Sequence, residues 1–314
     1  MSVTRPPRLV ALGDLLLDVV VAPERPIETG SDVPGTLAFK RGGSAANTAA
    51  AFSRAGGEAV LITSLGDDAW ATHLLASLRA ERVRVHAVRH PGRSGRLAAI
   101  IDERGERSFV TDRGVADQLA ADEIRDAWLR GADILHIPAY SLFAEPIATA
   151  ARHAAAAARE TGTLVSTDLS SSGPLLAHGV RRSHAGLREL APDLLFANRA
   201  EAAAILRAGG RRAWPGLLEV APLAVVKDGM WGCRVLRRED GAVRQVDVAA
   251  SRVGRTLDTS GAGDAFAAGF LHALLASGGR SVLGRDPVLR RAALAGHRAA
   301  GEALRRDRPE IRPR

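Results

Sequence analysis

A glycine-rich turn followed by an acid is the stretch of this chain best suited to chemistry. Gly261 and Gly263 flank Ala262 directly before Asp264, and apolar residues then recur at helical spacing. Unpaired backbone N–H groups lie at the positive end of a helix dipole, and small residues let an anion approach them closely. The turn could therefore hold a phosphate with Asp264 at its edge, or Asp264 could simply cap the helix.

Two groups of polar and glycine residues near the N-terminus suit a sugar. Asp14 and Asp18 follow the first short apolar run, and an ionised carboxylate accepts several hydroxyl hydrogen bonds at once. Gly42 and Gly43 precede a small-residue helix pattern that carries Asn47, whose amide can both donate to and accept from a polyol. Either acid could instead be a turn residue, and the two glycines could form a simple turn.

Two motifs in the second half suit a nucleotide and its metal. Asn198 and Glu201 follow an apolar run, where they could order waters around Mg²⁺ or form a capping box at the start of a helix. Lys227 ends the run AVVK and is followed by Gly229 and Gly232. Lysine occurs at only one other position, so this one suggests a phosphate contact, although a solvated lysine is the alternative.

Short apolar runs alternate with helix patterns along the chain and must position these residues. This alternation predicts an α/β fold with a mostly parallel central sheet and helices on both faces, which would place ligands beyond the carboxyl ends of the strands. The predicted strands are Leu9–Leu12, Ala59–Ser64, Ile134–Ile137, Leu164–Thr167, Leu194–Ala197 and Ala224–Val226. The predicted helices are Ser44–Arg54, Asp68–Arg79, Glu145–Glu160 and Arg199–Ala208.

Two segments, approximately 18–41 and 95–114, interrupt this alternation with β-like pieces. The first contains Pro23, Pro26 and Pro34, and the second has a hairpin pattern around DERGER. We expect them to form a small β lid inserted in a single domain of residues 1–314, where it could exclude water during a reaction and could also make a homodimer.

Composition excludes several classes of protein. The net charge is +8, but the arginines are dispersed and aromatics are only 4%, which disfavours a nucleic-acid binder. No apolar run reaches the ~20 residues of a membrane span, and no signal peptide is evident. Cys233 is the only cysteine, so we expect a cytoplasmic protein without a cysteine-built metal site. We expect the densest basic cluster, RRDRPEIRPR, to be a frayed end.

Four motifs together resemble the ribokinase, or pfkB, family of carbohydrate kinases. They are GGSAANTAAAFSRAGGEAVLITSLGDD, NRAE, KDGMWG and DTSGAGDAFAAGF, in the family order and spacing. The resemblance covers nearly the whole chain and implies a ribokinase-like fold that uses ATP and Mg²⁺ to phosphorylate a sugar.

The resemblance also implies roles for the motif residues. Asp264 would be the catalytic base, and Gly261, Ala262 and Gly263 would form the anion hole. The residues that would bind the sugar are Asp18, Gly42, Gly43 and Asn47. Those that would serve the nucleotide are Asn198, Glu201, Lys227, Gly229 and Gly232, with Glu201 reaching Mg²⁺ through water. Asp258 and Thr259 match positions that bind a monovalent cation, such as K⁺, in many members.

The sequence leaves the substrate open. At Lys227 the chain resembles family members that phosphorylate 2-keto-3-deoxygluconate. The guanidinium of Arg113 could bind the carboxylate of such a sugar acid. However, the run LVSTD is followed by LSSSG, without the arginine expected there for a sugar acid. The motifs are compatible with a neutral sugar, a sugar acid or a nucleoside as the substrate. The alternative to an enzyme is a protein that binds a sugar or nucleotide without catalysis. Dinucleotide oxidoreduction is disfavoured because no G-x-G-x-x-G turn follows the first predicted strand.

Overall fold

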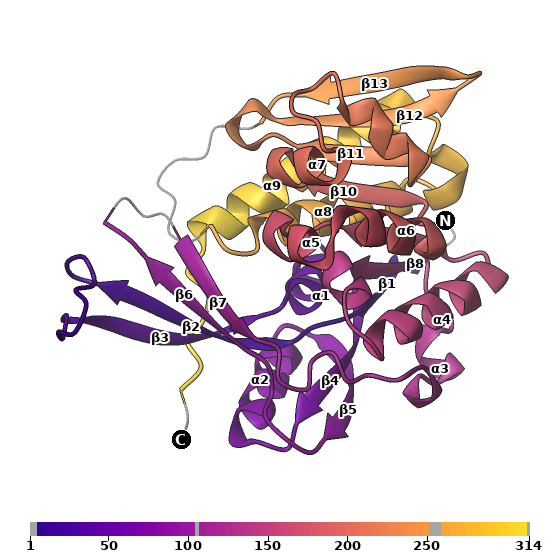
Figure 1. The fold of residues 1–314 in the computed structure, drawn as a ribbon. Helices are drawn as coiled ribbons and strands as arrows, with labels where there is room; N and C mark the ends of the chain where they lie inside the picture. Colours follow the sequence, from indigo (N-terminus) through magenta and orange to yellow (C-terminus); the bar gives the residue numbers. More distant parts are fainter. Residues whose placement is uncertain (1–4, 104–106, 251–258, 313–314) are drawn as a thin grey trace.

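Two β-sheets organise the chain in the computed structural model, which describes residues 5–103, 107–250 and 259–312 (Figure 1). The larger sheet contains β1 (Arg8–Leu12), β4 (Glu58–Gly66), β5 (Val83–His90), β8 (Ile134–Pro138), β9 (Leu164–Asp168), β10 (Leu194–Asn198), β11 (Leu223–Lys227), β12 (Cys233–Glu239) and β13 (Ala242–Val248). The smaller sheet contains β2 (Leu16–Pro23), β3 (Gly35–Gly42), β6 (Arg96–Ile101) and β7 (Arg107–Asp112).

The order of strands in the larger sheet is β13-β12-β11-β10-β9-β8-β1-β4-β5. Strands β5 to β11 in this order run parallel, and β12 and β13 add an antiparallel edge. After β1 the chain first continues through β4 and β5, and then returns to the other side of β1 with β8. The strand order therefore reverses between β1 and β8, and open α/β sheets bind their ligands beyond the carboxyl ends of the strands at such a point.

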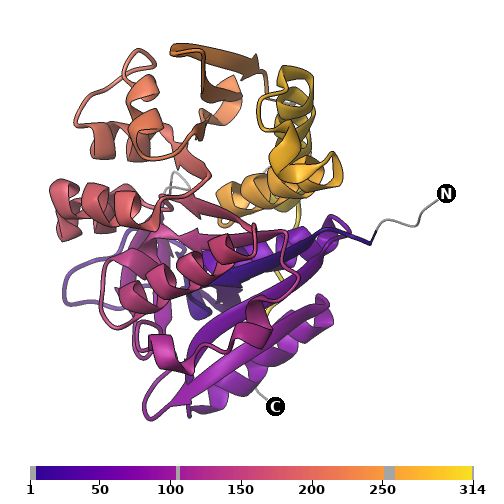
Figure 2. The same cartoon turned by 90° about the vertical axis from the view of Figure 1, so that its right-hand side faces the viewer.

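Helices cover both faces of this sheet (Figure 2). One face carries α1 (Ser44–Arg54), α2 (Ala69–Ala80), α8 (Ala262–Ala276) and α9 (Asp286–Arg305). The other face carries α3 (Asp126–Leu129), α4 (Ile147–Glu160), α5 (Ser172–His178), α6 (Val180–Leu190) and α7 (Arg199–Leu206). Short 3₁₀ helices span Ala121–Glu123, Ala139–Leu142, Trp214–Glu219, Gly229–Trp231 and Gly279–Val282.

Alternation along the buried strands builds two cores. In β1, Leu9 and Ala11 pack with the α1 and α8 side, whereas Val10 and Leu12 pack with the α4 and α7 side. Successive residues of a strand point to opposite faces, and burial of a Leu or Val side chain contributes about 1.5–3 kcal/mol. A strand covered on both faces therefore needs an unbroken apolar run, which is the signal that the sequence carries.

The predicted α/β architecture is confirmed, with boundaries that agree to within a few residues. The predicted helix Ser44–Arg54 has the same bounds as α1, and the strand predicted at Leu9–Leu12 is β1 with Arg8 added. The expected β lid is present as the smaller sheet, in the order β3-β2-β6-β7, which extends away from the larger sheet in Figure 1.

The C-terminal segment corrects an expectation. It was expected to be a frayed end, but its described residues run along the lid, where Ile311 N donates to Phe39 O over 2.6 Å and Lys40 Nζ lies 2.5 Å from Asp307 Oδ1. A backbone bridge between Lys40 and Glu310 adds to these contacts. The segment of residues 306–312 is therefore a strap that ties α9 to β3.

Two glycines let α8 and α9 pack closely. A methyl group at Gly269 would lie 2.7 Å from Ala299 Cβ, and one at Gly296 would lie 2.9 Å from Phe266 O. Contacts this short cannot accommodate a side chain, so glycine is required for the approach of the two helices. The packing fixes the axis of α8, whose first turn carries the glycine-rich loop.

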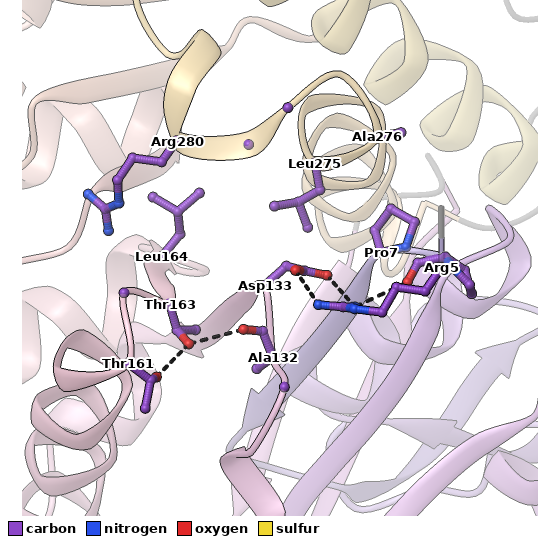
Figure 3. A pocket seen from close by; sticks show the side chains of 15 residues that line it. Arg5, Pro7, Ala132, Asp133, Thr161, Thr163, Leu164, Leu275, Ala276 and Arg280 are labelled. Carbon is purple, nitrogen blue, oxygen red and sulfur yellow. Dashed lines mark hydrogen bonds and ion pairs between the residues drawn. The ribbon is translucent and has the colours of Figure 1, made fainter. Parts of the chain in front are cut away.

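A cavity of about 850 Å³ lies away from the predicted motifs, near the amino ends of β1, β8 and β9 (Figure 3). Its charged side chains are paired, because Arg5 binds Asp133 at 2.7 Å and Arg280 binds Asp193 at 2.7 Å. Ligands of parallel sheets bind at the opposite edge. The candidate active site is therefore expected at the carboxyl ends of the strands.

No helix in the described ranges is both long and apolar enough to cross a membrane.

Candidate active site

The glycine-rich loop forms the first turn of α8. Gly261 is the N-cap residue and has a φ of 76°, a left-handed conformation that glycine adopts without strain. A methyl group at Gly261 would lie 3.4 Å from Asn47 Nδ2 and 3.8 Å from Asp264 Oδ2, so the loop, Asn47 and Asp264 are neighbours. The loop thus presents backbone N–H groups at a helix N-terminus beside a carboxylate, which is the geometry of an anion site.

Asp264 is held by α1. Ser44 Oγ donates to Asp264 Oδ1 over 2.7 Å, and Asn47 Nδ2 donates to Oδ2 over 3.1 Å. Both oxygens therefore accept hydrogen bonds from another helix, which a residue that only capped its own helix would not need. Helix α1 packs beside α8, and its small residues let the two come close.

The environment of Asp264 tunes its proton affinity. Burial is the largest influence and, together with the negative charge of Asp168, raises the pKa of Asp264 to about 6, against the lowering effects of Ser44, Asn47 and Lys227. The carboxyl group is therefore ionised at neutral pH but binds a proton far more readily than an exposed aspartate. This is the property required of a general base.

Lys227 is an internal cation at the end of β11. Its Nζ lies 2.5 Å from Asp168 Oδ2, and a methyl group at Gly263 would lie 3.2 Å from the same Nζ. Burial favours the neutral amine, but the charges of Asp168 and Glu201 dominate and raise the pKa of Lys227. The alternative of a solvated lysine is wrong, because the side chain is only 14% exposed.

Asn198 and Glu201 form a capping box at the start of α7. Glu201 N donates to Asn198 Oδ1 over 2.9 Å, and Asn198 N donates to Glu201 Oε2 over 2.7 Å. Glu201 is buried, and this burial together with the charge of Asp168 raises its pKa to about 7. The predicted alternative of a capping box is thus confirmed. With this pKa the Glu201 carboxyl group is incompletely ionised at neutral pH, and the charges of Asp168 and Lys227 act on it.

This donor set fits a magnesium ion that is bound largely through water and phosphate. Asp168 and Glu201 offer hard carboxylate oxygens, and a nearby dication would favour the ionised form of Glu201. Across the described residues, no group of three or more His, Cys, Asp or Glu side chains could hold a metal alone. Mg²⁺ typically keeps several waters and binds one or two carboxylates plus substrate phosphates.

The glycines after Lys227 form a tight turn. Gly229 and Gly232 have φ values of 59° and 96°, and a methyl group at Gly232 would lie 2.0 Å from Val248 O. The turn brings β12 back beside β11, with Cys233 opposite Lys227 in the register.

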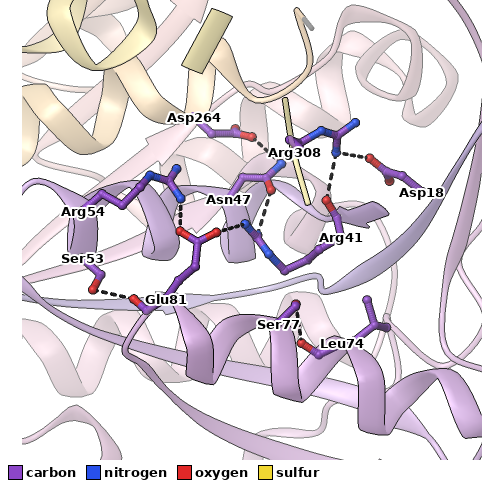
Figure 4. Close-up of polar contacts among 10 residues, drawn as sticks. All are labelled: Asp18, Arg41, Asn47, Ser53, Arg54, Leu74, Ser77, Glu81, Asp264 and Arg308. Carbon is purple, nitrogen blue, oxygen red and sulfur yellow. Dashed lines mark hydrogen bonds and ion pairs between the residues drawn. The ribbon is translucent and has the colours of Figure 1, made fainter. Parts of the chain in front are cut away.

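Asp18 and Asn47, two of the predicted sugar residues, are linked through Arg308 and Arg41 (Figure 4). A methyl group at Gly42 would lie 1.8 Å from Asp18 Oδ1, so glycine is required there for the carboxylate to occupy its place. Gly43 has a φ of 95° and begins α1, which carries Asn47. Asp18 is buried, which raises its pKa, and Arg308 of the strap donates to its Oδ2 over 2.6 Å.

Arg113 is engaged by two carboxylates. Its Nη1 lies 3.0 Å from Asp14 Oδ2 and its Nη2 lies 2.6 Å from Asp117 Oδ1, while the guanidinium stacks over Tyr140 at 5.4 Å from the ring centre. The carboxylates raise its pKa above the ordinary value of arginine, against the opposing effect of burial. A sugar carboxylate would have to compete with Asp14 for this cation.

Of the two residues predicted to bind a monovalent cation, one belongs to the described part of the chain. Asp258 lies outside the described residues, and Thr259 is exposed at the start of the loop.

Sequence reasoning missed four side chains that complete the site. Ser44 and Arg41 flank the predicted glycine pair, but their bonds to Asp264 and Asn47 depend on tertiary packing. Asp168 ends the run LVSTD, and an acid at the carboxyl end of a predicted strand was a usable signal. Arg308 gave no local sequence signal, because 290 residues separate it from its partner Asp18.

Comparison with known proteins agrees with this geometry. The model of the pfkB family carbohydrate kinases matches residues 6–308. The chain is 30% identical over 288 residues to a probable chloroplastic fructokinase-6 of Arabidopsis thaliana, covering 87% of this chain and 71% of that protein. It is 32% identical over 277 residues to an ATP-dependent ribose-1-phosphate kinase of Halopiger xanaduensis, covering 86% of each.

Solved structures share the whole fold. The crystal structure of an adenosine kinase from Sinorhizobium meliloti superposes with a TM-score of 0.81 at 26% identity and covers 96% of this chain and 95% of that one. The resemblance expected from the four motifs is thereby confirmed. The chain belongs to the pfkB family of carbohydrate kinases, enzymes that transfer a phosphoryl group from ATP to a sugar.

Proposed function

We propose that Asp264 is the general base of this carbohydrate kinase. The observation that carries the proposal is the position of its carboxylate, which Ser44 and Asn47 hold beside the Gly261–Gly263 loop. As the sugar hydroxyl oxygen attacks the γ-phosphorus of ATP, the bond from that phosphorus to the β-bridging oxygen breaks. The hydroxyl proton passes to Asp264, and ADP leaves.

The loop and Lys227 supply fixed positive potential in this proposal. Phosphoryl transfer is accelerated mainly by positioning and by electrostatic stabilisation of the phosphoryl oxygens. The N–H groups of Gly261, Ala262 and Gly263 would receive the γ-phosphate, and the Lys227 ammonium lies next to Gly263. Mg²⁺, held through water by Glu201, would neutralise charge on the β- and γ-phosphates.

The sugar would lie between the lid and α1. Asp18 and Asn47 would accept from and donate to its hydroxyls, while Gly42 leaves room for the Asp18 carboxylate and Gly43 lets the chain pass close to the Asp14 backbone. A neutral sugar fits this site better than a sugar acid, because Asp14 and Asp117 already compensate the charge of Arg113. The relatives named as a fructokinase and a ribose-1-phosphate kinase supply the two substrate types to test first.

A substrate panel tests the function. ADP release is measured with ATP and Mg²⁺ on fructose, ribose, ribose 1-phosphate, 2-keto-3-deoxygluconate and adenosine, with K⁺ or tetramethylammonium as the monovalent cation. We expect turnover with fructose or ribose 1-phosphate and little with the sugar acid. Preferred turnover of the sugar acid would contradict the reading of Arg113. Equal rates with both cations would contradict a K⁺ site at Asp258 and Thr259.

We also propose that the lid pairs with a second copy of the chain in the cytoplasm. Three large apolar side chains on its strands are more than half exposed: Leu37 at 62%, Phe109 at 57% and Val110 at 65%. Exposed apolar groups of this kind are typical of an interaction surface. Light scattering at micromolar concentration should give the mass of a dimer, and a Phe109→Asp variant should give that of a monomer. A monomeric wild-type protein would exclude this interface.

A further inference from the structure

A chain of polar contacts links the end of α2 to the candidate base (Figure 4). Glu81, the C-cap residue of α2, accepts a hydrogen bond from Arg41 Nη2 over 3.3 Å and another from Arg54. Arg41 Nη1 donates to Asn47 Oδ1 over 2.9 Å. Asn47 Nδ2 in turn donates to Asp264 Oδ2 over 3.1 Å.

The chemistry of the two ends fixes the orientation of the amide between them. A guanidinium can only donate, so the Asn47 atom that faces Arg41 must be the carbonyl oxygen. An ionised carboxylate can only accept, so the atom that faces Asp264 must be the NH₂ group. Without Arg41, the amide oxygen would lose its donor and could bond to water, and the amide could move so that its NH₂ group no longer points at Asp264.

Burial makes this arrangement specific. Arg41 is only 8% exposed, and Glu81 holds its second nitrogen. Arg41, Asn47 and Gly261 border a cavity of about 220 Å³, which gives water room to replace the guanidinium if it is removed. The contacts of Arg41 with Glu81 and Asn47 are therefore suited to holding one side-chain geometry rather than to attracting a ligand from solution.

We propose that Arg41 is a positioning residue for the phosphoryl-transfer reaction, which holds the Asn47 amide with its NH₂ group directed at Asp264 and is itself held by Glu81. This inference rests on the proposed role of Asp264 as the base. It adds a residue that does not touch the reacting atoms but controls one of the two hydrogen bonds to the base.

Other charges also act on the two ends of the chain of contacts. Asp264 is influenced by Asp168 and Lys227, and it in turn affects Glu201 and Tyr140. The groups that act on Arg41 are Glu81, Arg54, Arg308 and Asp18. An Arg41 variant leaves the groups around Asp264 in place, so a change in the titration of Asp264 would report the Asn47 contact and the lost guanidinium charge.

The test is the pH dependence of an Arg41→Met variant. The hydrogen bond from Asn47 stabilises ionised Asp264, so its loss raises the pKa of the base. We expect the acidic limb of the kcat/KM profile to move upward by roughly one pH unit, the size typical of one hydrogen bond to a charged group. The value of kcat/KM at pH 7 should fall roughly twofold and recover above pH 8, where the base is again ionised. An unmoved acidic limb would overturn the proposal.

Three further variants separate positioning from structural support. Arg237 is as buried as Arg41, with 8% of its surface exposed, but it pairs with Asp286 and Glu239. It lies at the end of the β11–β12 pair opposite to Lys227. The Arg237→Met variant should therefore lower the melting temperature without moving the acidic limb of the kcat/KM profile. Arg41→Lys retains a donor for Asn47 and should keep the limb near its wild-type position. In an Asn47→Ala background, Arg41→Met should add little further shift.

The results of these variants distinguish the positioning role of Arg41 from the proposed role of Asp264 as the general base. A full additional shift in the Asn47→Ala background would show that Arg41 acts by charge alone and would overturn the positioning role. Near-wild-type turnover of an Asp264→Asn variant would instead remove the base itself, whatever Arg41 does.

Discussion

Asp264→Asn is expected to fold like the wild-type protein, to bind ATP, and to lose roughly 10²- to 10⁴-fold in kcat, the range of general-base catalysis. The amide has the same size and can keep a hydrogen bond from Ser44, but it cannot take the proton of a sugar hydroxyl. Steady-state ADP release and calorimetric ATP binding measure the two properties separately. Turnover within tenfold of wild type would contradict the assignment.

The stability of the same variant supplies an internal check. Because burial raises the pKa of Asp264 to about 6 in the folded protein, folding is favoured by protonation of this group. That stabilising contribution is complete below the unfolded pKa near 4 and is lost as the pH rises through 6. At pH 7 the neutral amide should therefore leave the melting temperature equal to or above that of wild type. A large loss of stability would mean that lost turnover reports misfolding.

The pH profile of the wild-type enzyme follows from the same group. Asp264 must be ionised to act as a base, so kcat/KM for the sugar should fall below about pH 6.

Lys227→Met is expected to lower both turnover and stability. Removal of one partner of a buried ion pair leaves the Asp168 carboxylate uncompensated, which typically costs about 3–5 kcal/mol in the free energy of unfolding. Removal of one fixed donor from a transition state typically costs about 10²- to 10³-fold in kcat. Urea unfolding and kinetics at saturating ATP measure the two effects.

A double variant separates these effects. Asp168→Asn with Lys227→Met removes both charges of the pair, so much of the lost stability should return, while turnover should stay low. Recovery of turnover with stability would show that Lys227 serves the fold alone. The single variant should also raise the pKa of Asp264, because the Lys227 charge lowers it, and move the acidic limb of kcat/KM upward.

Local sequence signals predicted most of the elements that hold the site. The helix Ser44–Arg54 was predicted with its observed bounds, because small and apolar residues at helical spacing follow two glycines. The strand ends that carry Asn198 and Lys227 were placed within one residue, because buried parallel strands need apolar runs. Such patterns involve neighbouring residues, so a single chain reveals them.

The sequence could not choose between alternative roles for the same residue. Asn198 and Glu201 matched both a capping box and a metal site, and the structure shows the capping box with a buried, incompletely ionised Glu201. By residue type Arg113 suited the carboxylate of a sugar acid, and the structure shows it paired with Asp14 and Asp117. Such choices depend on which charges lie nearby in space, and spacing along the chain does not encode this.

By itself, the sequence determined the α/β architecture, the lid, and the loop of Gly261 to Gly263 with Asp264. Only the tertiary structure decided what surrounds that acid. Ser44 meets Asp264 across 220 positions, and Arg308 meets Asp18 across 290. Local propensity extends over a few residues, whereas burial and Coulomb interactions depend on distance in the folded state. The pKa of Asp264 and the contact of the strap with Asp18 are therefore properties of the fold.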